Sequence, residues 1–596
     1  MSSREAREAA PPAPTEWRWF FRELRPHAGV QVMGVTALLA STVLSLADPL
    51  IIKWLVDAGL QQRRWSVVLW AVGLLCGVFL LRLVLLHVGT LSSAQVLQRV
   101  VLSLRLRLLR KLQGLDAAFY DRHRPGDLVH RLEQDAEVFG QVAADVLPGL
   151  VRILLGLAVT LAIMVGLDWR LSLVVLPFVP ALLWLRAHFR KRLEAAAETT
   201  RSATGLRTSF LSESLHANLQ VQLLGAERFF LRRYAGLAVG TTRANLAQRS
   251  TELVYLAASL TVVVLATAAV LLAGAYEFMH GFLTLGGYVA FYSYLMRLLD
   301  PLGSAVETHA RLKRAGSSIR RLAEIERFEP SVRDRADARA VDPAAVREVD
   351  FRGVEFGYGP GGPLLRGVDL RLRRGDRVAL VGQSGSGKSS LARLMVRLYD
   401  PAAGAVHLDG ADLRGLRLRG VRDAASYVPQ APVLFPGTLR ENVLLGVRAT
   451  DEALDRLARV ACFDSVLAKF PGRWDHVLGT GGSGLSDGER QRLGLLRALV
   501  RDRPFLVLDE STGALDPATE AEVMDRLDAH TRGKGVLLIT HRPAAARWAD
   551  RIAVLRDGRL DDAAPPGEAA VPAEHAVPVG QGDGPGHALR TPALVS

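Results

Sequence analysis

The sequence predicts an all-α membrane domain of six transmembrane helices, followed by an α/β ATPase domain that contains a phosphate-binding loop (P-loop). Two observations support this prediction. The first half of the 596-residue chain contains long apolar runs with few charges, which are typical of helices that cross a bilayer. In the second half, short apolar runs typical of strands alternate with helical stretches, and one of these runs leads into a glycine-rich loop.

Six runs in the first half are candidates for spanning helices, which need about 20 mostly apolar residues each. They lie near residues 30–52, 65–86, 146–167, 171–185, 253–275 and 282–302. Because six is an even number, both termini are expected on the same side of the membrane. The protein is therefore predicted to be a multi-pass protein of the lipid bilayer.

Arginine-rich segments indicate which side faces the cytoplasm. Short loops follow the first, third and fifth runs, whereas long helical segments near residues 99–144 and 186–251 follow the second and fourth. The positive-inside rule places these long segments, and with them both termini, in the cytoplasm. Since a helix rises about 1.5 Å per residue, each pair of arms would extend tens of Å from the bilayer.

The formal net charge of +14 would by itself fit a nucleic acid or a membrane surface as partner. The arginines cluster between the apolar runs, near residues 99–111 and 186–192, which favours the membrane and argues against nucleic acid. The two cysteines, Cys76 and Cys462, form no ligand cluster and indicate no disulfide framework. Residues 1–16 have no apolar core and are expected to be a cytosolic tail, not a signal peptide.

Composition divides the chain into five predicted parts. These are a cytosolic N-terminal segment (1–27), the transmembrane domain with two long cytoplasmic loops (28–315), a linker (316–349), the ATPase domain (350–562) and a disordered C-terminal tail (563–596). The strand-like runs that define the ATPase domain lie at residues 354–356, 378–381, 425–428, 505–508 and 535–539.

The P-loop lies between an apolar strand-like run and a helical pattern that begins after it. It consists of Gly382, Gln383, Ser384, Gly385, Ser386, Gly387, Lys388, Ser389 and Ser390. The glycines let backbone N–H groups surround phosphates, Lys388 is expected to reach the β and γ oxygens, and Ser389 to offer its hydroxyl to Mg²⁺. The sequence therefore predicts that the chain binds ATP or GTP.

A second apolar run, residues 505–508, ends in two carboxylates, Asp509 and Glu510. A phosphate loop needs an acidic partner to hold its metal, so Asp509 is predicted to hold Mg²⁺ through water. Glu510 follows directly, where it could polarise an attacking water.

Between these motifs lies the run Gly484-Leu485-Ser486-Asp487-Gly488-Glu489-Arg490-Gln491-Arg492. At these residues the chain resembles the ATP-binding cassette transporters, specifically half-transporters of the exporter type. The resemblance extends over nearly the whole chain. It identifies residues 119–135 and 213–227 as the first and second coupling segments, and residues 283–286 with 300–302 as part of the sixth span.

The resemblance implies roles for further residues. Tyr358 would stack on adenine, Gln430 would join the Mg²⁺ and water shell, and His541 would contact the γ-phosphate. Ser486 and Gly488 would contact the nucleotide of a second cassette, and Asp516 would lie against that opposite cassette. Together with Glu510 and Lys388 these residues imply ATP hydrolysis with Mg²⁺ as cofactor.

In the family, ATP lies between the P-loop of one cassette and the signature run of another, so the resemblance implies a dimer with a second half-transporter. The implied function is ATP-driven export of an amphipathic small molecule, lipid or peptide across the plasma (inner) membrane. Two alternatives are an importer built on the exporter fold and a regulator that binds ATP without transport. Whether the dimer has two identical chains stays open.

Three features depart from the family pattern. Asp487 stands where the signature usually has glycine, so its carboxylate could repel the partner's γ-phosphate; alternatively, Ser486 and Glu489 form a capping box in which an acidic first residue suits the helix dipole. Thr480 stands where a glutamate that meets the coupling helices is common. The closing helix after residue 560 is not recognisable. These departures leave room for a heterodimer.

Five ionisable residues lie within the predicted spans: Asp48, Arg82, Arg152, Arg297 and Asp300. Such groups are costly in lipid and often functional. Their positions near helix ends favour pairing or extension of the side chain toward the membrane surface. We therefore assign no substrate-binding residue.

Overall fold

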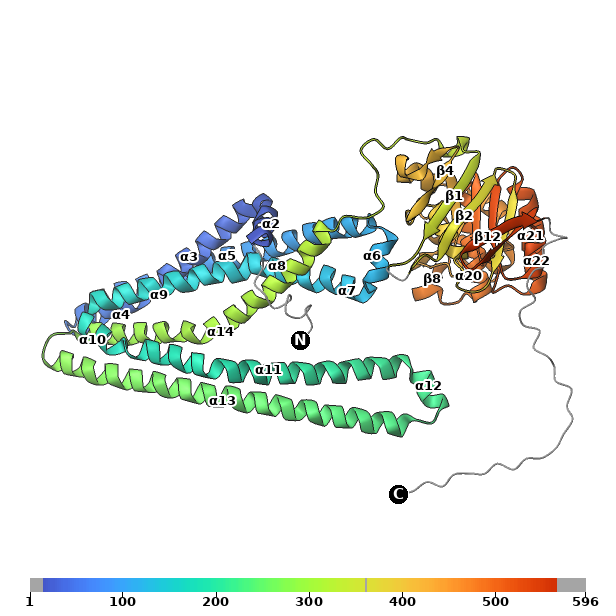
Figure 1. Ribbon diagram of the computed structural model, residues 1–596. Helices are drawn as coiled ribbons and strands as arrows, with labels where there is room; N and C mark the ends of the chain where they lie inside the picture. Colours follow the sequence, from blue (N-terminus) through green and yellow to red (C-terminus); the bar gives the residue numbers. More distant parts are fainter. Residues whose placement is uncertain (1–13, 360–361, 565–596) are drawn as a thin grey trace, which may run out of the picture. The chain divides into compact units, whose positions relative to one another are not determined.

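The computed structural model describes residues 14–359 and 362–564, with the side chains of residues 14–15, 299–310, 313–314, 480 and 562–564 also outside the description (Figure 1). The chain forms two compact units. One contains residues 1–114 and 125–328, and the other contains residues 115–124 and 329–596. We call them the membrane unit and the cassette unit. The predicted tail, 563–596, lies almost entirely outside the described residues.

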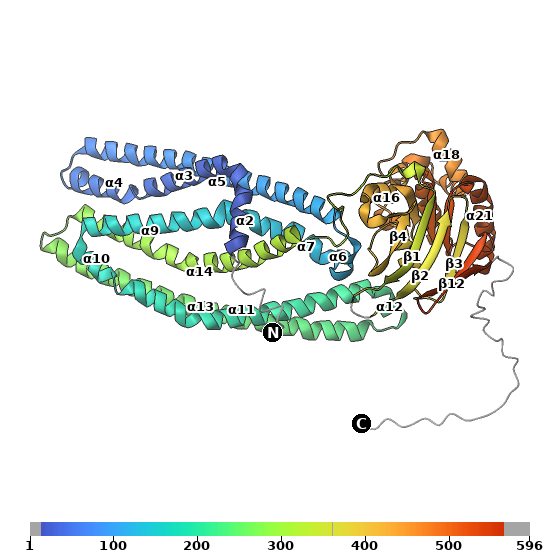
Figure 2. The ribbon, with the colours of Figure 1, turned by 45° about the horizontal axis from the view of Figure 1, so that its top comes forward.

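The membrane unit is entirely helical. Its elements are α2 (Pro14–Leu24), η1 (Arg25–His27), α3 (Ala28–Ser45), α4 (Asp48–Trp54), η2 (Leu55–Leu60), α5 (Trp65–Gln113), α7 (Pro125–His130), η3 (Arg131–Asp135), α8 (Ala136–Gln141), η4 (Val142–Val146), α9 (Leu147–Leu167), α10 (Trp169–Val175), α11 (Phe178–His216), α12 (Asn218–Leu223), α13 (Glu227–Met279) and α14 (Leu285–Arg327). α11 and α13 run side by side along their length, and α12 joins their ends (Figures 1 and 2).

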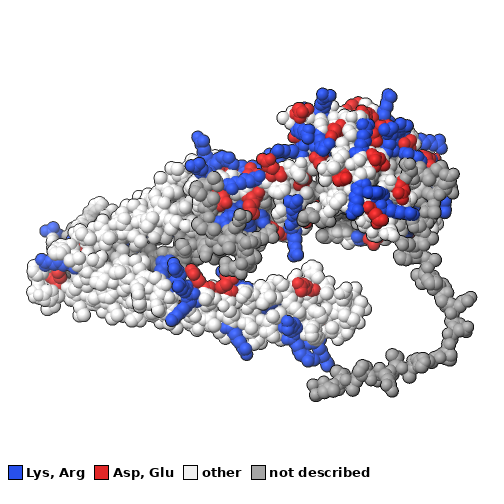
Figure 3. Space-filling model, in the orientation of Figure 1, with Lys and Arg blue, Asp and Glu red and all other residues white. Residues whose placement is uncertain are grey.

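Five helical stretches among the described residues are long and apolar enough to cross a membrane. They are Glu16–Leu60, Trp65–Gln113, Pro125–Leu167, Trp169–His216 and Glu227–Met279. The sixth predicted span, near residues 282–302, falls at the start of α14, and part of that helix lies outside the described side chains. Large apolar side chains such as Trp70, Leu154 and Leu272 are exposed, as expected for a surface in contact with lipid. Figure 3 shows long uncharged stretches on the visible face of this unit.

Two of the predicted spans are interrupted by proline. A two-residue turn separates α3 from α4 and precedes Pro49, and a second turn separates α10 from α11 at Pro177. Proline lacks a backbone N–H and its ring clashes with the preceding turn, so a continuous helix is disfavoured at both places. By contrast, α5, with 49 residues, and α13, with 53, run without interruption far beyond the width of a bilayer.

The cassette unit contains two sheets. A four-stranded antiparallel sheet has the order β2-β1-β4-β5, with β1 (Glu348–Phe356), β2 (Leu365–Arg373), β4 (Ala403–Leu408) and β5 (Ala411–Asp412). A six-stranded sheet has the order β12-β11-β3-β10-β9-β6, with β3 (Arg377–Gly382), β6 (Ala425–Val428), β9 (Phe505–Asp509), β10 (Gly535–Ile539), β11 (Arg551–Arg556) and β12 (Arg559–Ala564). A short ribbon pairs β7 (Gly437–Thr438) with β8 (Val477–Leu478). All five predicted strands are confirmed.

The larger sheet is parallel except for β12. Strands β9 and β10 are fully buried, which is typical of parallel sheets covered on both faces by helices (Figure 1). The helices are α15 (Lys388–Met395), α16 (Leu418–Ala424), α17 (Leu439–Leu444), α18 (Asp451–Val460), α19 (Asp464–Leu467), α20 (Asp487–Arg501), α21 (Pro517–Thr531) and α22 (Pro543–Ala546). Ligands of such sheets bind beyond the carboxyl ends of the parallel strands, where Gly382 and Asp509 lie.

One short helix from the first predicted coupling segment, α6 (Ala117–Arg122), belongs to the cassette unit. Asp116 caps it by accepting a hydrogen bond from the Phe119 backbone N–H at 3.1 Å. The second oxygen of Asp116 accepts hydrogen bonds from the backbone N–H groups of Ser331, at 2.5 Å, and Val332, at 3.3 Å, and from the Ser331 hydroxyl. These bonds lower the pKa of Asp116, although burial acts to raise it. The segment that connects the two units thus fixes α6 against the cassette.

Candidate functional site

The P-loop joins β3, an inner strand of the larger sheet, to α15 at the carboxyl end of that strand. Gly385 and Gly387 have positive φ angles of 81° and 106°, and a Cβ at Gly387 would lie 2.7 Å from a Leu365 methyl group. Glycine is therefore required there both for conformation and for space. Lys388 Nζ donates hydrogen bonds to the carbonyl oxygens of Gly382 and Gln383, each at 2.8 Å, so that the lysine spans the loop.

Two further features of the loop fit a phosphate ligand. Lys388 is only 6% exposed, and burial lowers its pKa although Glu510 and Asp509 act to raise it. A buried cation whose hydrogen bonds go to neutral carbonyl groups is stabilised further when an anionic ligand binds to it. The hydroxyl of Ser386 is buried and has no hydrogen-bond partner among the described residues. It is an available donor inside the loop.

Asp509 lies at the end of β9, next to the hydroxyl of Ser389 at the start of α15. Ser389 Oγ donates to Asp509 Oδ1 at 2.9 Å, and Tyr427 OH donates to Asp509 Oδ2 at 2.6 Å. Asp509 is 4% exposed. Hydroxyl and carboxylate oxygens are ligands that Mg²⁺ prefers, with phosphates supplying others. Within residues 14–359 and 362–564, no cluster of three or more His, Cys, Asp or Glu forms.

Glu510 is held between two polar side chains from other elements. Gln430 Nε2 donates to Glu510 Oε2 at 2.7 Å, and His541 Nδ1 lies 3.7 Å from Glu510 Oε1. Glu510 itself adopts a left-handed backbone conformation with φ of 47°, which is strained for a residue with a side chain. The structure therefore brings together Lys388, Ser389, Gln430, Asp509, Glu510 and His541, all predicted from the sequence.

Two residues of this constellation were missed by sequence reasoning. Tyr427 holds Asp509, as described above, and burial together with that carboxylate raises the pKa of its hydroxyl. Gln491 Nε2 donates to the carbonyl oxygens of Gln430, at 3.0 Å, and Glu510, at 3.3 Å, while its oxygen accepts from the Ala514 N–H at 2.9 Å. Gln491 belongs to the signature run, but its bracing contacts arise only in the folded cassette.

Tyr358, predicted to stack on adenine, is 45% exposed. Its hydroxyl lies 3.0 Å from Ser390 Oγ and accepts a hydrogen bond from Arg393 Nη1 at 3.2 Å. The ring packs edge-on against Phe356, with centroids 4.9 Å apart. Tyr358 is thus fixed beside the P-loop helix while part of its ring stays open to a ligand.

The signature run begins α20, where both expected hydrogen bonds of a capping box are present. The Ser486 hydroxyl accepts from the Glu489 N–H at 3.3 Å, and Glu489 Oε2 accepts from the Ser486 N–H at 2.8 Å. Asp487 is the first residue of the helix. Its side chain is 83% exposed and lies 3.6 Å from Arg490 Nη1. A Cβ at Gly488 would lie 3.0 Å from the Ala514 carbonyl oxygen, which explains a glycine at this position.

Among the described residues, no hydrogen bond or ion pair joins Ser486, Gly488 or Asp516 to the P-loop. Asp516 instead caps α21 by accepting from the Thr519 N–H at 3.0 Å, which lowers the pKa of Asp516. The roles predicted for these three residues toward a second cassette stay predictions. The side chain of Thr480 lies outside the described residues.

Three of the five ionisable residues in the predicted spans pair with one another. Asp48 Oδ2 accepts from Arg82 Nη1 at 2.7 Å and from Arg297 Nη2 at 3.0 Å, and Arg297 Nη1 donates to the Ser45 carbonyl oxygen at 2.6 Å. Pairing was the expected arrangement. The side chain of Asp300 lies outside the described residues.

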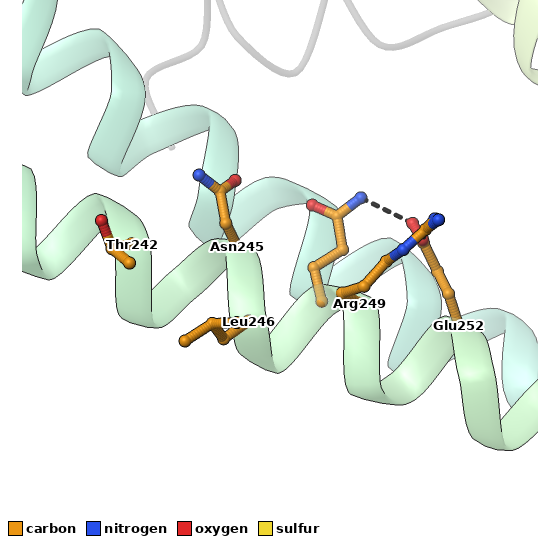
Figure 4. Close-up of a pocket in the computed structure, with 6 residues that line it drawn as sticks. Thr242, Asn245, Leu246, Arg249 and Glu252 are labelled. Atoms are coloured by element: carbon orange, nitrogen blue, oxygen red, sulfur yellow. Dashed lines mark hydrogen bonds and ion pairs between the residues drawn. The ribbon is translucent and has the colours of Figure 1, made fainter.

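A hollow of about 400 Å³ lies along α13, far in sequence from the P-loop (Figure 4). Its polar lining is held together internally: Gln248 Nε2 donates to Glu252 Oε1 at 2.9 Å, and Arg249 Nη1 donates to Glu252 Oε2 at 3.0 Å.

Comparisons with known proteins agree with this geometry. Residues 32–302 match a family model described as the ABC transporter transmembrane region, and residues 365–513 match one described as ABC transporter. The ATP-dependent lipid A-core flippase of Thiobacillus denitrificans is 31% identical over 557 residues, which cover 92% of this chain and 95% of that protein. The Escherichia coli K12 protein of the same name is 30% identical over 555 residues, covering 90% and 93%.

Among solved structures, the chain is similar to a bacterial Atm1-family ABC exporter with ATP bound. The TM-score is 0.75 at 26% sequence identity, and the match covers 91% of this chain and 95% of the other.

Proposed function

We propose that this chain, which belongs to the ABC transporters, carries a lipid across the inner membrane as a dimer. It is an ATP-driven exporter with its transmembrane and ATPase domains in one polypeptide. The single observation that carries the catalytic part is the convergence of Ser389, Asp509 and Glu510 at the ends of β3 and β9. The lipid substrate class is supported by the names of the relatives that are 31% and 30% identical.

Each residue of the site has a role in the proposed hydrolysis. Lys388 exchanges its carbonyl partners for phosphate oxygens, with Ser386 as an additional donor. Ser389, Asp509 through water, and Gln430 would hold Mg²⁺, which when bound neutralises charge on the phosphates. Glu510 orients and polarises the attacking water, and His541 contacts the γ-phosphate.

The proposed dimer completes each site with residues from the second chain. Ser486 caps α20 and Gly488 lies in its first turn, at a helix N-terminus whose backbone N–H groups favour anions, and Asp516 caps α21. The exposed Asp487 is the specific observation that favours a heterodimer, since its carboxylate would weaken the site that this chain's signature completes. We also propose that both termini are cytoplasmic, because the cassette needs the side where ATP is present and an even number of spans returns the chain to the same side.

ATP hydrolysis by the purified chain alone in lipid nanodiscs tests the proposal, with Glu510→Gln as the matched variant. General-base catalysis contributes roughly 10²- to 10⁴-fold, so we expect the variant to lose turnover by at least about a hundredfold while it still binds ATP. The transport part is tested by the loss of a fluorescent phospholipid from one leaflet of proteoliposomes on addition of ATP.

The outcomes separate the parts of the proposal. Equal turnover by the variant would show that Glu510 does not activate the water. ATP binding without turnover by the unmodified chain would point to a different partner chain. Turnover without lipid movement would contradict the proposed substrate class alone.

A further inference from the structure

Two tyrosines and a phenylalanine form a continuous aromatic cluster beneath the proposed adenine site. The ring centroids of Tyr358 and Tyr399 lie 5.3 Å apart with an interplanar angle of 88°, and Phe356 packs against Tyr399 at 5.4 Å. Edge-to-face contacts of this kind depend on ring orientation. Tyr399 is buried, whereas Tyr358 is about half exposed, so the cluster leads from the cassette surface into its core.

The far end of Tyr399 reaches α6. Its hydroxyl donates a hydrogen bond to Asp121 Oδ2 at 2.6 Å. Burial and this carboxylate raise the pKa of Tyr399, so the hydroxyl stays protonated and keeps its role as donor. Asp121 lies in α6, which the chain joins directly to α5 on one side and α7 on the other.

We propose that Tyr399 is a positioning residue that couples adenine binding at Tyr358 to the position of α6. The inference rests on the proposed function, because it takes Tyr358 as the residue that stacks on adenine. A base lying on the exposed face of Tyr358 restricts the orientation of that ring. Because the Tyr358 and Tyr399 rings meet edge to face, this restricts the position of Tyr399. The hydrogen bond from the Tyr399 hydroxyl then restricts Asp121, and with it α6. Coupling between two binding equilibria is reciprocal, so the state of α6 also biases adenine binding.

A second anchor of α6 provides a matched comparison. The Ser331 hydroxyl donates a hydrogen bond to Asp116, the N-cap residue of α6, and Ser331 is not part of the aromatic cluster. Tyr399→Phe and Ser331→Ala each remove one hydroxyl that binds a carboxylate on α6. Only the former lies between α6 and the adenine site.

Hydrogen–deuterium exchange of the α6 amides in the full chain, in lipid nanodiscs, tests the proposal with and without Mg²⁺ and ATP. We expect ATP to change the exchange of α6 in the unmodified chain and in Ser331→Ala, and this change to be lost in Tyr399→Phe although ATP still binds. Asp121→Ala should also lose it, whereas Asp121→Asn, which keeps an acceptor oxygen, should retain part of it. Inorganic tripolyphosphate, which has no base, should not produce the change.

Contrary results are equally specific. An ATP-dependent change that persists in Tyr399→Phe, an equal loss in Ser331→Ala, or no change in the unmodified chain would overturn the coupling role. Tyr358→Ala separates this failure from failure of the proposed function. If that variant binds ATP as tightly as the unmodified chain, the adenine assignment itself is wrong.

Discussion

Asp487 carries an exposed charge within the signature run, and this charge can be tested in isolation. Its carboxylate lies at the start of α20, 3.6 Å from Arg490 Nη1. Removing the charge with Asp487→Asn should tighten ATP binding in the proposed dimer, because repulsion of the γ-phosphate is lost. For a partly solvated charge pair worth ~1 kcal/mol, we expect the KM for ATP to fall about fivefold.

The control for this change is Asp475→Asn, which removes another exposed carboxylate from the cassette. A KM that stays the same or rises in Asp487→Asn would mean that the carboxylate does not face a phosphate. The capping box made by Ser486 and Glu489 would then be the main feature of this helix start.

Tyr427 gives a second prediction at the residue scale. Tyr427→Phe removes the hydroxyl that holds Asp509 and should leave that carboxylate less well oriented toward the metal. Loss of such outer contacts typically costs about 10- to 100-fold in metal affinity, so the Mg²⁺ concentration that half-activates ATP hydrolysis should rise by at least about tenfold. Titration with Mg²⁺ at saturating ATP measures this, and an unchanged midpoint would contradict the role of Tyr427.

The residues proposed to contact phosphate or metal could be predicted from the sequence because their chemistry imposes a fixed spacing. Lys388 and Ser389 follow the loop glycines, and Asp509 ends a strand. Tyr427 and Gln491 could not be assigned contacts in this way. Tyr427 binds the Asp509 side chain and Gln491 binds backbone carbonyl oxygens, and these partners are set by how β6, β9 and α20 pack.

At the scale of the element, the C-terminal end of α21 carries a histidine whose ionisation is coupled to folding. His530 Nε2 is buried without a hydrogen-bond partner among the described residues, and burial, with a smaller effect of Lys534, lowers its pKa. Below the ordinary histidine pKa of about 6.5 the unfolded chain binds more protons than the folded one, so stability falls as pH falls through that value.

We therefore expect the melting temperature of the cassette to decrease on going from about pH 7.5 to about pH 5.5, and to decrease less in His530→Gln. Thermal unfolding of the full chain in nanodiscs at the two pH values measures the difference. An identical decrease in both proteins would assign the pH dependence to other groups.

Strands and long helices could be predicted because their patterns are local. The breaks inside the spans were predictable in principle from Pro49 and Pro177, yet the apolar runs continue through both prolines. Attachment of α6 to the cassette unit could not be predicted from periodicity, because it depends on hydrogen bonds from Ser331 and Tyr399, more than 200 residues away in sequence.

At the scale of the whole molecule, the main prediction is that the P-loop of one chain meets the signature run of a second chain across ATP. A disulfide between two copies tests whether this chain can supply both. With Cys76 and Cys462 replaced by serine, the variant Ser384→Cys, Ser486→Cys should form a disulfide between copies when ATP and Mg²⁺ are present, because the resemblance places the P-loop of one chain against the signature of the other. A band with the mass of two chains on a non-reducing gel measures formation of this disulfide. The single variants, which cannot form the same bond, serve as controls.

A crosslink that forms equally without nucleotide would show that the P-loop of one copy and the signature run of the other meet independently of ATP. No crosslink in a preparation that hydrolyses ATP would contradict the proposed arrangement of the two chains.

The uninterrupted course of α13 also has a mechanical consequence. Its 53 residues make a rod about 80 Å long that carries no proline and no break. A stiff rod does not absorb rotation along its length: a tilt of about 5° at one end displaces the other by about 7 Å at this length. A shift of a few Å at the cytoplasmic end of α13 therefore requires the membrane-spanning end to tilt by only a few degrees, and the helix acts as a lever between the two.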